Sequence, residues 1–364
     1  MQYPTISEYV KASQDASDNL DMPTEATNAE LNEAITDEWG VKYSKDGRKL
    51  LKAPQELNGT YPIRKGLYGT YSIKEGTKII CNWAFSGCRS LFDIVIPDGV
   101  TSIGNHAFEG CSALNSLVLP DGVTRIGDSA FEDCFALFDI VIPEGVISIG
   151  ERAFVGCISL KSLVFPDGVT SIGDGAFWRC NSLNSVVIPD SVTSIGEYTF
   201  SGCRSLSSLV IPDGVTSIGY GAFWCCTSLN SVVLPSSVTS VGKCAFEDCF
   251  ALFDIVIPDG VTSIGDNAFD NCRSLSSIVI PNGVTRIEKS AFKGCKSMTD
   301  IVIPDSVTSI GGYAFLNCES LTDIVIPNSV TSIEDSAFSG CNIPNALKQE
   351  LISRFGEKIF LVIL

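Results

Sequence analysis

A strict 23-residue period is the feature of this sequence that most limits how the chain can fold. Proline recurs at that spacing from Pro97 to Pro327, phenylalanine from Phe85 to Phe338, and cysteine from Cys88 to Cys341, always three residues after a phenylalanine. The three columns keep one register with no insertion. Self-similarity at a fixed period of this length is typical of repeat proteins, in which each unit packs on its neighbours.

The unit that runs from Ile172 to Ser194 shows how one repeat is organised. The pattern Leu183-x-x-Val186-x-Ile188 predicts a short strand that follows a bend, with residues 186 and 188 on one face. Pro189 cannot donate to a β-ladder and ends that strand, and the residues after it make a turn. The stretch 173–180 is short enough for a helical turn or a 3₁₀ segment.

One repeat alone cannot be stable, because its few apolar side chains do not offset the conformational entropy of ordering 23 residues. Neighbouring turns must therefore share a core and pair their strands edge to edge. About twelve such turns, at about 4.8 Å per strand, make a body roughly 55 Å long. The sequence predicts a repeat solenoid.

The repeat pattern Ile-Pro-Asp-Gly-Val-Thr-Ser-Ile-Gly-x-x-Ala-Phe-x-x-Cys-x-Ser-Leu resembles the BspA-like leucine-rich repeat family over about residues 72–341, and 43–54 resembles the lead-in of many members. The resemblance implies a right-handed stack with a parallel β-sheet on the concave side and short turns, 3₁₀ or extended segments elsewhere. It also implies roles in adhesion or protein recognition, and many members are exported surface proteins.

Both ends of the chain carry sequences suited to covering the open core of a solenoid. We predict an N-terminal cap region over 1–60, about twelve repeats over 61–341, and a C-terminal cap over 342–364. In the first cap, Thr5-x-x-Glu8 and Thr27-x-x-Glu30 are capping boxes that open short helices, and Asp46-Gly47 is a hairpin turn. In the second, a helix begins at Pro344 and ends at Gly356, and the apolar run 359–364 forms a final strand; the alternative is a peptide tail for a partner.

The charge balance limits the partners of the chain. The formal net charge is −17, so nucleic acid and an anionic membrane surface are disfavoured, and no apolar run is long enough to span a bilayer. The first residues lack the pattern of a signal peptide, which predicts a cytoplasmic location; a surface or secreted location applies if a signal segment has been removed. A monomer is slightly favoured.

The cysteine column suggests disulfides or metal, but neither fits its pattern. Side chains in one column point the same way, which is poor geometry for a bridge, and His106 is the only histidine, so zinc is unsupported. We interpret the column as small buried thiols and expect no cofactor and no metal. The cysteines outside the column, which are the best candidates for reactive thiols, are Cys81, Cys225 and Cys244.

An acidic residue follows the repeated proline in eight repeats: Asp98, Asp121, Glu144, Asp167, Asp190, Asp213, Asp259 and Asp305. Aspartate after proline favours a turn, which is the interpretation we prefer. Weak association with calcium is the alternative, although no ordered calcium loop is present. The regular threonine column of the next turn forms a single row, which disfavours ice binding.

The candidate binding surface consists of the strand residues that should face outward from the concave sheet. A valine column flanked by polar columns, with phenylalanine at intervals, suits a protein or peptide ligand. The alternative is that valine serves only the strand and phenylalanine packs between turns. The candidates are Phe92, Asp93, Val95, Phe138, Asp139, Val141, Phe253, Asp254, Val256, Asp300 and Asp323, with Trp178 and Trp224 on the convex side as secondary candidates.

Catalytic motifs are absent from the sequence: there is no nucleophile elbow, no phosphate-binding glycine loop and no acid pair outside the turns. We therefore predict no enzymatic activity. The favoured function is a protein- or peptide-binding scaffold that uses the concave sheet. The alternative, which rests on the family resemblance, is a cell-surface adhesin or host-interaction protein.

Overall fold

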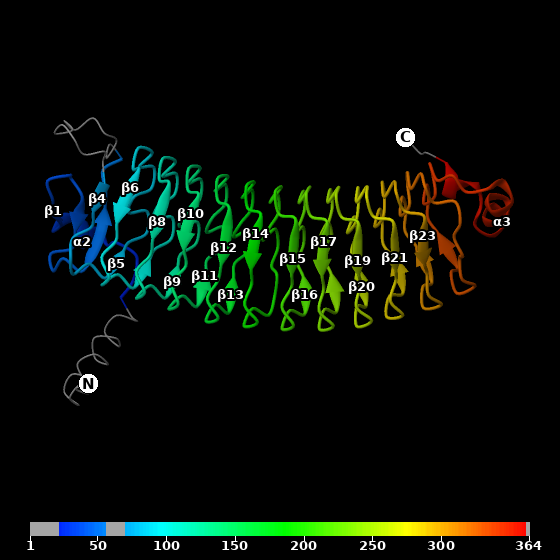
Figure 1. Cartoon of the computed structure of the whole chain (residues 1–364), viewed down its shortest axis with the longest axis horizontal. Coiled ribbons are helices and arrows are strands. Elements are labelled where there is room, and N and C mark those ends of the chain that lie inside the picture. The colour runs from blue at the N-terminus through cyan, green and yellow to red at the C-terminus, as the bar shows by residue number, and fades with distance from the viewer. Residues whose placement is uncertain (1–21, 56–69, 362–364) are drawn as a thin grey trace, which may run out of the picture.

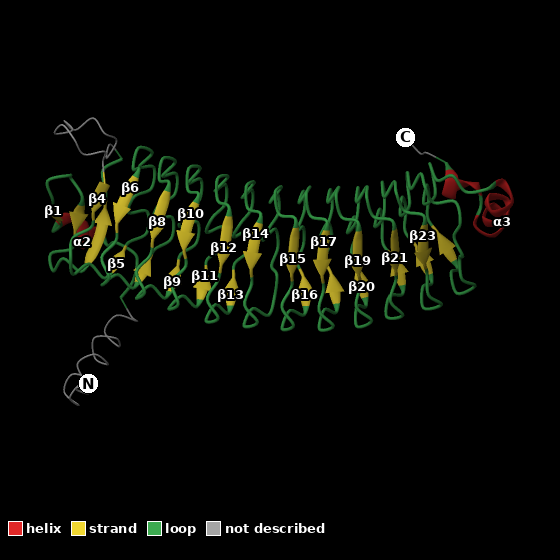
Figure 2. Cartoon of the chain, in the orientation of Figure 1, coloured by secondary structure: helices red, strands yellow, loops and turns green. Residues whose placement is uncertain are grey.

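The chain forms an elongated solenoid whose turns follow one another along a single axis, from the N-terminal cap to the C-terminal cap (Figure 1). This computed structural model describes residues 22–55 and 70–361. Figure 2 shows that helix is confined to the two ends, while strands and turns build everything between them. No helix in the described part of the chain is long and apolar enough to cross a bilayer.

The strands that the repeat pattern predicts lie in one row along the solenoid, which we call the first sheet, and hydrogen bonds pair them in five groups of two or three. Each is three residues long, with the middle residue buried and the last one exposed. Neighbours pair in parallel with like residues side by side, as Asp139 with Ser116 and Val141 with Val118. Its strands are β4 (Thr70–Ser72), β6 (Asp93–Val95), β8 (Ser116–Val118), β10 (Asp139–Val141), β12 (Ser162–Val164), β14 (Ser185–Val187), β15 (Ser208–Val210), β17 (Ser231–Val233), β19 (Asp254–Val256), β21 (Ser277–Val279) and β23 (Asp300–Val302).

A second row of parallel strands runs along the solenoid in three hydrogen-bonded groups, which the sequence pattern did not predict; we call it the second sheet. Its repeat strands have two residues, one outward and one inward, so they carry too little alternation to be recognised. They are β5 (Ile79–Ile80), β7 (Ser102–Ile103), β9 (Arg125–Ile126), β11 (Ser148–Ile149), β13 (Ser171–Ile172), β16 (Ser217–Ile218), β18 (Ser240–Val241), β20 (Ser263–Ile264), β22 (Arg286–Ile287), β24 (Ser309–Ile310) and β25 (Ser332–Ile333).

The turns are joined a third time along the bend that contains the repeated phenylalanine, which we call the bend ladder. In the turn around Phe108, the backbone N–H groups of His106, Phe108 and Gly110 donate to carbonyls of the next turn at 2.7–2.8 Å. The N–H groups that alternate with them bond three residues back, so the bend is a series of short turns. His106 and Gly110 adopt positive φ (56° and 69°), and this recurs in every repeat.

The core between these three ladders is made of stacked columns. The twelve repeated phenylalanines form one continuous stack, with neighbouring ring centroids 5.0–5.7 Å apart and ring planes within 14°. From Cys111 onward, each repeated cysteine donates its thiol hydrogen to the phenylalanine carbonyl 26 residues earlier, as Cys111 does to Phe85 at 3.2 Å, whereas Cys88 donates to the carbonyl of Pro54. Because each side chain contacts its own equivalents in the adjacent turns, one repeat contributes only part of a closed core.

The N-terminal cap closes the first turn with a helix and a hairpin. Helix α2 (Asn28–Asn32) has the predicted capping box between Thr27 and Glu30. Strands β1 (Ile35–Thr36), β2 (Lys42–Tyr43) and β3 (Lys49–Lys52) pair antiparallel, and the predicted turn at 46–47 joins the last two. Strand β3 then pairs in parallel with β5, which connects the cap to the second sheet. The capping box predicted at 5–8 lies outside the described residues.

The C-terminal cap differs from its prediction in one element. Helix α3 (Asn345–Phe355) follows Pro344 and ends at Gly356, which has φ 86°. The residues expected to begin a final strand instead belong to a 3₁₀ helix, η1 (Glu357–Phe360), and 362–364 lie outside the described residues. The strand prediction for 359–361 is wrong because Ile359 and Phe360 pack onto the open end of the core, next to Phe338, rather than along a sheet edge.

Candidate functional site

The outward face of the first sheet carries an apolar ridge along its whole length. From β6 onward the last residue of each first-sheet strand is valine, and Val325 holds the same position in the last repeat; where strands pair, the valines lie side by side, as Val210, Val233 and Val256 show. We call this column the valine ridge. Between 50% and 77% of each of its side chains is exposed; its members are Val95, Val118, Val141, Val164, Val187, Val210, Val233, Val256, Val279, Val302 and Val325.

The remaining first-sheet candidates also lie on this outward face. Phe92, Phe138 and Phe253 are 49%, 44% and 61% exposed, so they do not pack into the core. Each directly precedes an aspartate, and these aspartates share a column with Asp300 and Asp323. Asp93 is half-buried and accepts a hydrogen bond from Thr70 at 2.9 Å, whereas the other four are exposed. The structure thus arranges the predicted residues in three adjacent columns rather than in a pocket.

Acids on this face lack ion-pair partners in the described structure, whereas several acids elsewhere on the solenoid have them. Among the described residues, no ion pair involves an acid of the first-sheet columns or of the turns that follow them. On the bend ladder and second sheet, lysines and arginines do pair, as in Arg152–Glu132 (2.7 Å) and Arg286–Glu334 (2.6 Å). The ion pairs of the repeats therefore lie away from the first sheet.

The turns after the first sheet take the form that their Pro-Asp sequences predict. In the first of them, the N–H of Val100 donates to the carbonyl of Pro97 at 3.1 Å, and the same bond recurs in the other repeats. Asp98 projects from this turn and is exposed. Within residues 22–55 and 70–361, no group of three or more His, Cys, Asp or Glu side chains could hold a metal ion.

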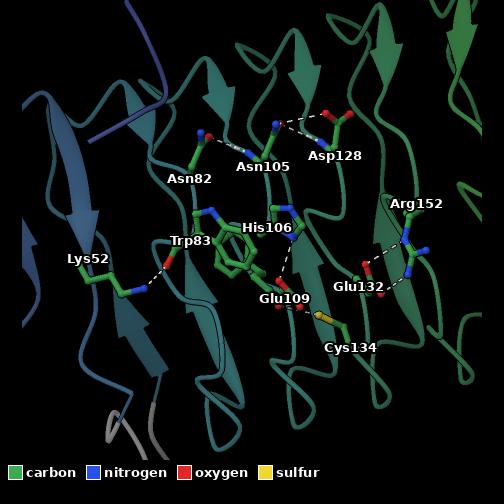
Figure 3. Close-up of polar contacts among 11 residues, drawn as sticks. Lys52, Asn82, Trp83, Asn105, His106, Glu109, Asp128, Glu132, Cys134 and Arg152 are labelled. Carbon is green, nitrogen blue, oxygen red and sulfur yellow. Dashed lines mark hydrogen bonds and ion pairs between the residues drawn. The ribbon is translucent and has the colours of Figure 1, made fainter. Parts of the chain in front are cut away.

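Polar side chains on the bend ladder of the first repeats are largely satisfied by one another (Figure 3). Asn82 accepts a hydrogen bond from the N–H of Asn105, and Asn105 accepts one from the N–H of Asp128, at 2.8 and 3.0 Å. His106 stacks on Trp83, with ring centroids 3.7 Å apart, and contacts Glu109 at 2.9 Å. These contacts join neighbouring turns and account for the polar residues without a ligand.

Figure 3 also shows the ion pair between Glu132 and Arg152, two turns into the repeats. Burial alone would raise the pKa of Glu132, but hydrogen bonds from Arg152 and Ser129 bring it below its usual value. The two residues are 20 positions apart, so the contact does not follow the repeat period. Sequence inspection gave no signal for this pair or for the stack of Trp83 on His106.

The secondary candidates Trp178 and Trp224 lie on the bend ladder in an aromatic cluster. Tyr198 lies between them, with ring centroids 6.0 Å from Trp178 and 6.4 Å from Trp224, and Tyr220 packs on Tyr198 at 4.9 Å. Arg179 lies over the ring of Trp178 at 5.1 Å. Both tryptophans are half-buried, and the Nε1 of Trp224 is buried without a hydrogen-bond acceptor. Much of the surface of both tryptophans is thus covered by other side chains of the protein.

The three cysteines outside the column are poor candidates for reactive thiols. Cys81 is buried, and burial raises its pKa to about 12. Cys225 and Cys244 are partly exposed, yet burial and the neighbouring acids Asp248 and Glu247 raise their pKa values to about 11 and about 12. A reactive thiol needs a lowered pKa, because the thiolate is the nucleophile. The structure therefore argues against the interpretation made from the sequence.

The sequence matches a family model described as BspA type leucine rich repeat region, over residues 68–184, 124–252, 170–299 and 239–362. Among solved structures, a leucine-rich repeat protein from Bacteroides ovatus is 30% identical, with a TM-score of 0.65 and 85% and 86% of the two chains covered. A leucine rich cell surface protein from Faecalibacterium prausnitzii is 31% identical, with a TM-score of 0.56 and 86% and 93% covered. No curated protein matches this sequence.

Proposed function

Because the chain belongs to the BspA-type leucine-rich repeat family, we propose that it is a non-enzymatic scaffold that binds a protein or peptide along the outward face of its first sheet. The observation that carries this proposal is the valine ridge, an unbroken row of exposed apolar side chains beside Phe92, Phe138 and Phe253. Soluble proteins rarely expose contiguous apolar surface of this extent unless something covers it.

The composition of this face supports recognition of a polypeptide. Large aromatic side chains provide contact area at low entropic cost, and a polar margin gives specificity, which is the arrangement of protein interfaces. The columns follow the solenoid axis over many turns, so the face suits an elongated ligand rather than a small molecule. No enzymatic role is proposed, because the acids of this face are spread along the solenoid instead of converging.

The test compares two sets of three alanine substitutions in the full chain. The first set, Phe92→Ala, Phe138→Ala and Phe253→Ala, removes the aromatic side chains of the first-sheet face. The matched control, Phe135→Ala, Ile147→Ala and Ile158→Ala, removes side chains with 44%, 56% and 41% exposure that lie off that face. Each protein is immobilised and incubated with lysate of the native organism, and the retained proteins are quantified by mass spectrometry.

We expect a partner that the wild type and the control set retain and that the first-sheet set loses by at least tenfold. Equal retention by all three proteins would place binding elsewhere. Circular dichroism of each variant verifies the fold, and we expect no change because the substituted side chains are exposed.

A surface location is a second candidate, favoured by one observation. The similar protein from Faecalibacterium prausnitzii, which the chain matches over 86% of its length, carries the description of a cell surface protein. We propose on this basis that the scaffold acts at the cell surface as an adhesin or host-interaction protein. Fractionation of native cells tests the location: recovery only from the cytosol excludes it.

A further inference from the structure

The valine ridge has acidic residues on both of its sides: a strand column in which five aspartates (Asp93, Asp139, Asp254, Asp300 and Asp323) alternate with runs of serine, and the acids that follow the repeated proline. The aspartate column precedes the ridge by two strand residues, so it lies on the same outward face at about 7 Å. The acids that follow the repeated proline, such as Asp98 and Asp213, lie three residues beyond the ridge and are exposed. Between residues 92 and 325, Lys161 is the only basic residue in the columns that form this surface.

None of these carboxylates forms an ion pair in the described structure, because the ion pairs of the repeats lie on the bend ladder and the second sheet. A row of negative charges beside an apolar surface determines which charge a ligand of that surface must carry. Like charges brought together across an interface disfavour binding, whereas opposite charges favour it and speed association. The same argument disfavours a second copy of this chain placed face to face, and an anionic lipid surface.

We propose that the occupant of this face is a basic polypeptide segment in which lysine or arginine side chains alternate with apolar ones. This inference rests on the proposed function and adds the chemical class of the partner. The apolar side chains cover the valine ridge, and the cations lie beside the two acidic columns. The ridge is about 50 Å long, which an extended segment of roughly 15 residues spans.

Fluorescence anisotropy with three labelled 14-residue probes tests the partner class directly on the full chain at 50 mM salt. The probes are seven repeats of Lys-Val, of Glu-Val and of Lys-Ser. We expect the Lys-Val probe to bind, the Glu-Val probe to bind at least 100-fold more weakly, and the Lys-Ser probe at least tenfold more weakly. Raising the salt to 500 mM weakens the Lys-Val complex, because the charges of this face are exposed to solvent.

Two sets of substitutions with the same change in net charge locate the site. Asp139→Asn, Asp254→Asn and Asp300→Asn remove charge beside the ridge, and we expect the Lys-Val probe to bind at least tenfold more weakly. The control set, Glu151→Gln, Glu197→Gln and Glu357→Gln, removes exposed charge elsewhere, and we expect binding within twofold of the wild type.

Equal weakening by both sets would show diffuse attraction to an acidic protein and would overturn the inference, as would equal binding of the Lys-Val and Glu-Val probes. Failure of the proposed function has a different signature. If a native partner depends on Phe92, Phe138 and Phe253 while the probes do not discriminate, the face binds a polypeptide of another charge class.

Discussion

The bend ladder and the outward face of the first sheet follow the same 23-residue period, yet their side chains differ in burial and in the partners that they contact. On the bend ladder, phenylalanine rings stack on each other, and Glu132 and Asp270 pair with basic residues. On the first-sheet face, the valines are mostly exposed and the acids lack ion-pair partners in the described structure. The period builds both surfaces, but ion pairs form only outside the first-sheet face among the described residues.

This difference distinguishes the columns that stabilise the fold from those available to bind a partner. Where a repeated column is buried, its regularity is explained by contacts between turns, and it says little about partners. Where a repeated column stays exposed and apolar, packing within the chain does not explain it. The valine ridge and its acids therefore carry the proposals, while Trp178 and Trp224, which pack within their own cluster, carry none.

Raising the pH until the column thiols lose their protons should destabilise the bend ladder more than any other change. Burial raises the pKa of the column thiols, so the folded state keeps their protons above pH 8.5, where the unfolded chain releases them. Stability is thus fully present below about pH 8.5 and is lost as the pH rises towards the folded-state values. Each buried thiol costs about 1.4 kcal/mol between pH 7.5 and 9.5. The buried column thiols are Cys88, Cys111, Cys134, Cys157, Cys180, Cys203, Cys226, Cys249, Cys272, Cys295 and Cys318.

Guanidinium unfolding under reducing conditions at the two pH values measures this loss, which we expect to exceed 10 kcal/mol for the whole stack. A variant with Cys180→Ala, Cys203→Ala and Cys226→Ala has three fewer titrating thiols. It should be less stable at pH 7.5 but lose about 4 kcal/mol less than the wild type by pH 9.5. A pH-independent free energy of unfolding would contradict the burial of the column.

Removing one aromatic ring from each region sharpens the comparison. Phe177 is fully buried between Phe154 and Phe200, at 5.4 and 5.6 Å, so Phe177→Ala should lower the free energy of unfolding by about 3–5 kcal/mol. Phe253 is 61% exposed, and Phe253→Ala should change it by about 0.5 kcal/mol or less. Denaturant unfolding measures the free energy of unfolding of both variants. Similar losses of stability in the two would contradict the prediction.

Two glycines in one repeat test how closely the turns approach. A Cβ added at Gly173, at the end of β13, would lie 2.4 Å from the backbone nitrogen of Glu151 in the preceding turn. We expect Gly173→Ala to cost about 1–3 kcal/mol, because the backbones must separate. At Gly168, in the turn after the first sheet, the nearest atom is 3.5 Å away, and Gly168→Ala should be nearly neutral. Thermal unfolding that ranks them in the reverse order would refute the close packing.

Substitutions on the valine ridge should have the smallest effect on stability. Val164→Thr, Val210→Thr and Val233→Thr keep the branched side chain that suits a strand, so each should change the free energy of unfolding by about 0.5 kcal/mol or less. The same triple variant should bind the Lys-Val probe at least tenfold more weakly, because the apolar cover is lost. If stability falls while binding is kept, the ridge serves the fold instead.

The buried columns were readable from the sequence because each residue packs beside its equivalent 23 positions away. Once the register is known, the phenylalanine stack, the buried cysteines and the pairing of Val141 with Val118 follow. The capping box at Thr27 and the helix end at Gly356 were also predictable, since both depend on local backbone chemistry.

Three features did not follow from the period. The second sheet has strands of two residues, which leave no alternation to detect. The positive φ of Trp83 and Arg152 belongs to residue types that rarely adopt it, and it is imposed by the bonds between turns. The ion pairs 20 or 48 residues apart, and the 3₁₀ helix that replaces the expected final strand, depend on which surfaces meet in space.

The sequence by itself determined the solenoid, its inward columns and the residues that line the outward face of the first sheet, because a fixed period makes neighbours in space equivalent in sequence. The tertiary structure decided which exposed groups remain unsatisfied. Whether an acid pairs with a lysine or arginine depends on the reach of two side chains across a turn, and the period does not encode that distance. The contrast between the paired bend ladder and the unpaired first-sheet face therefore became visible only in three dimensions.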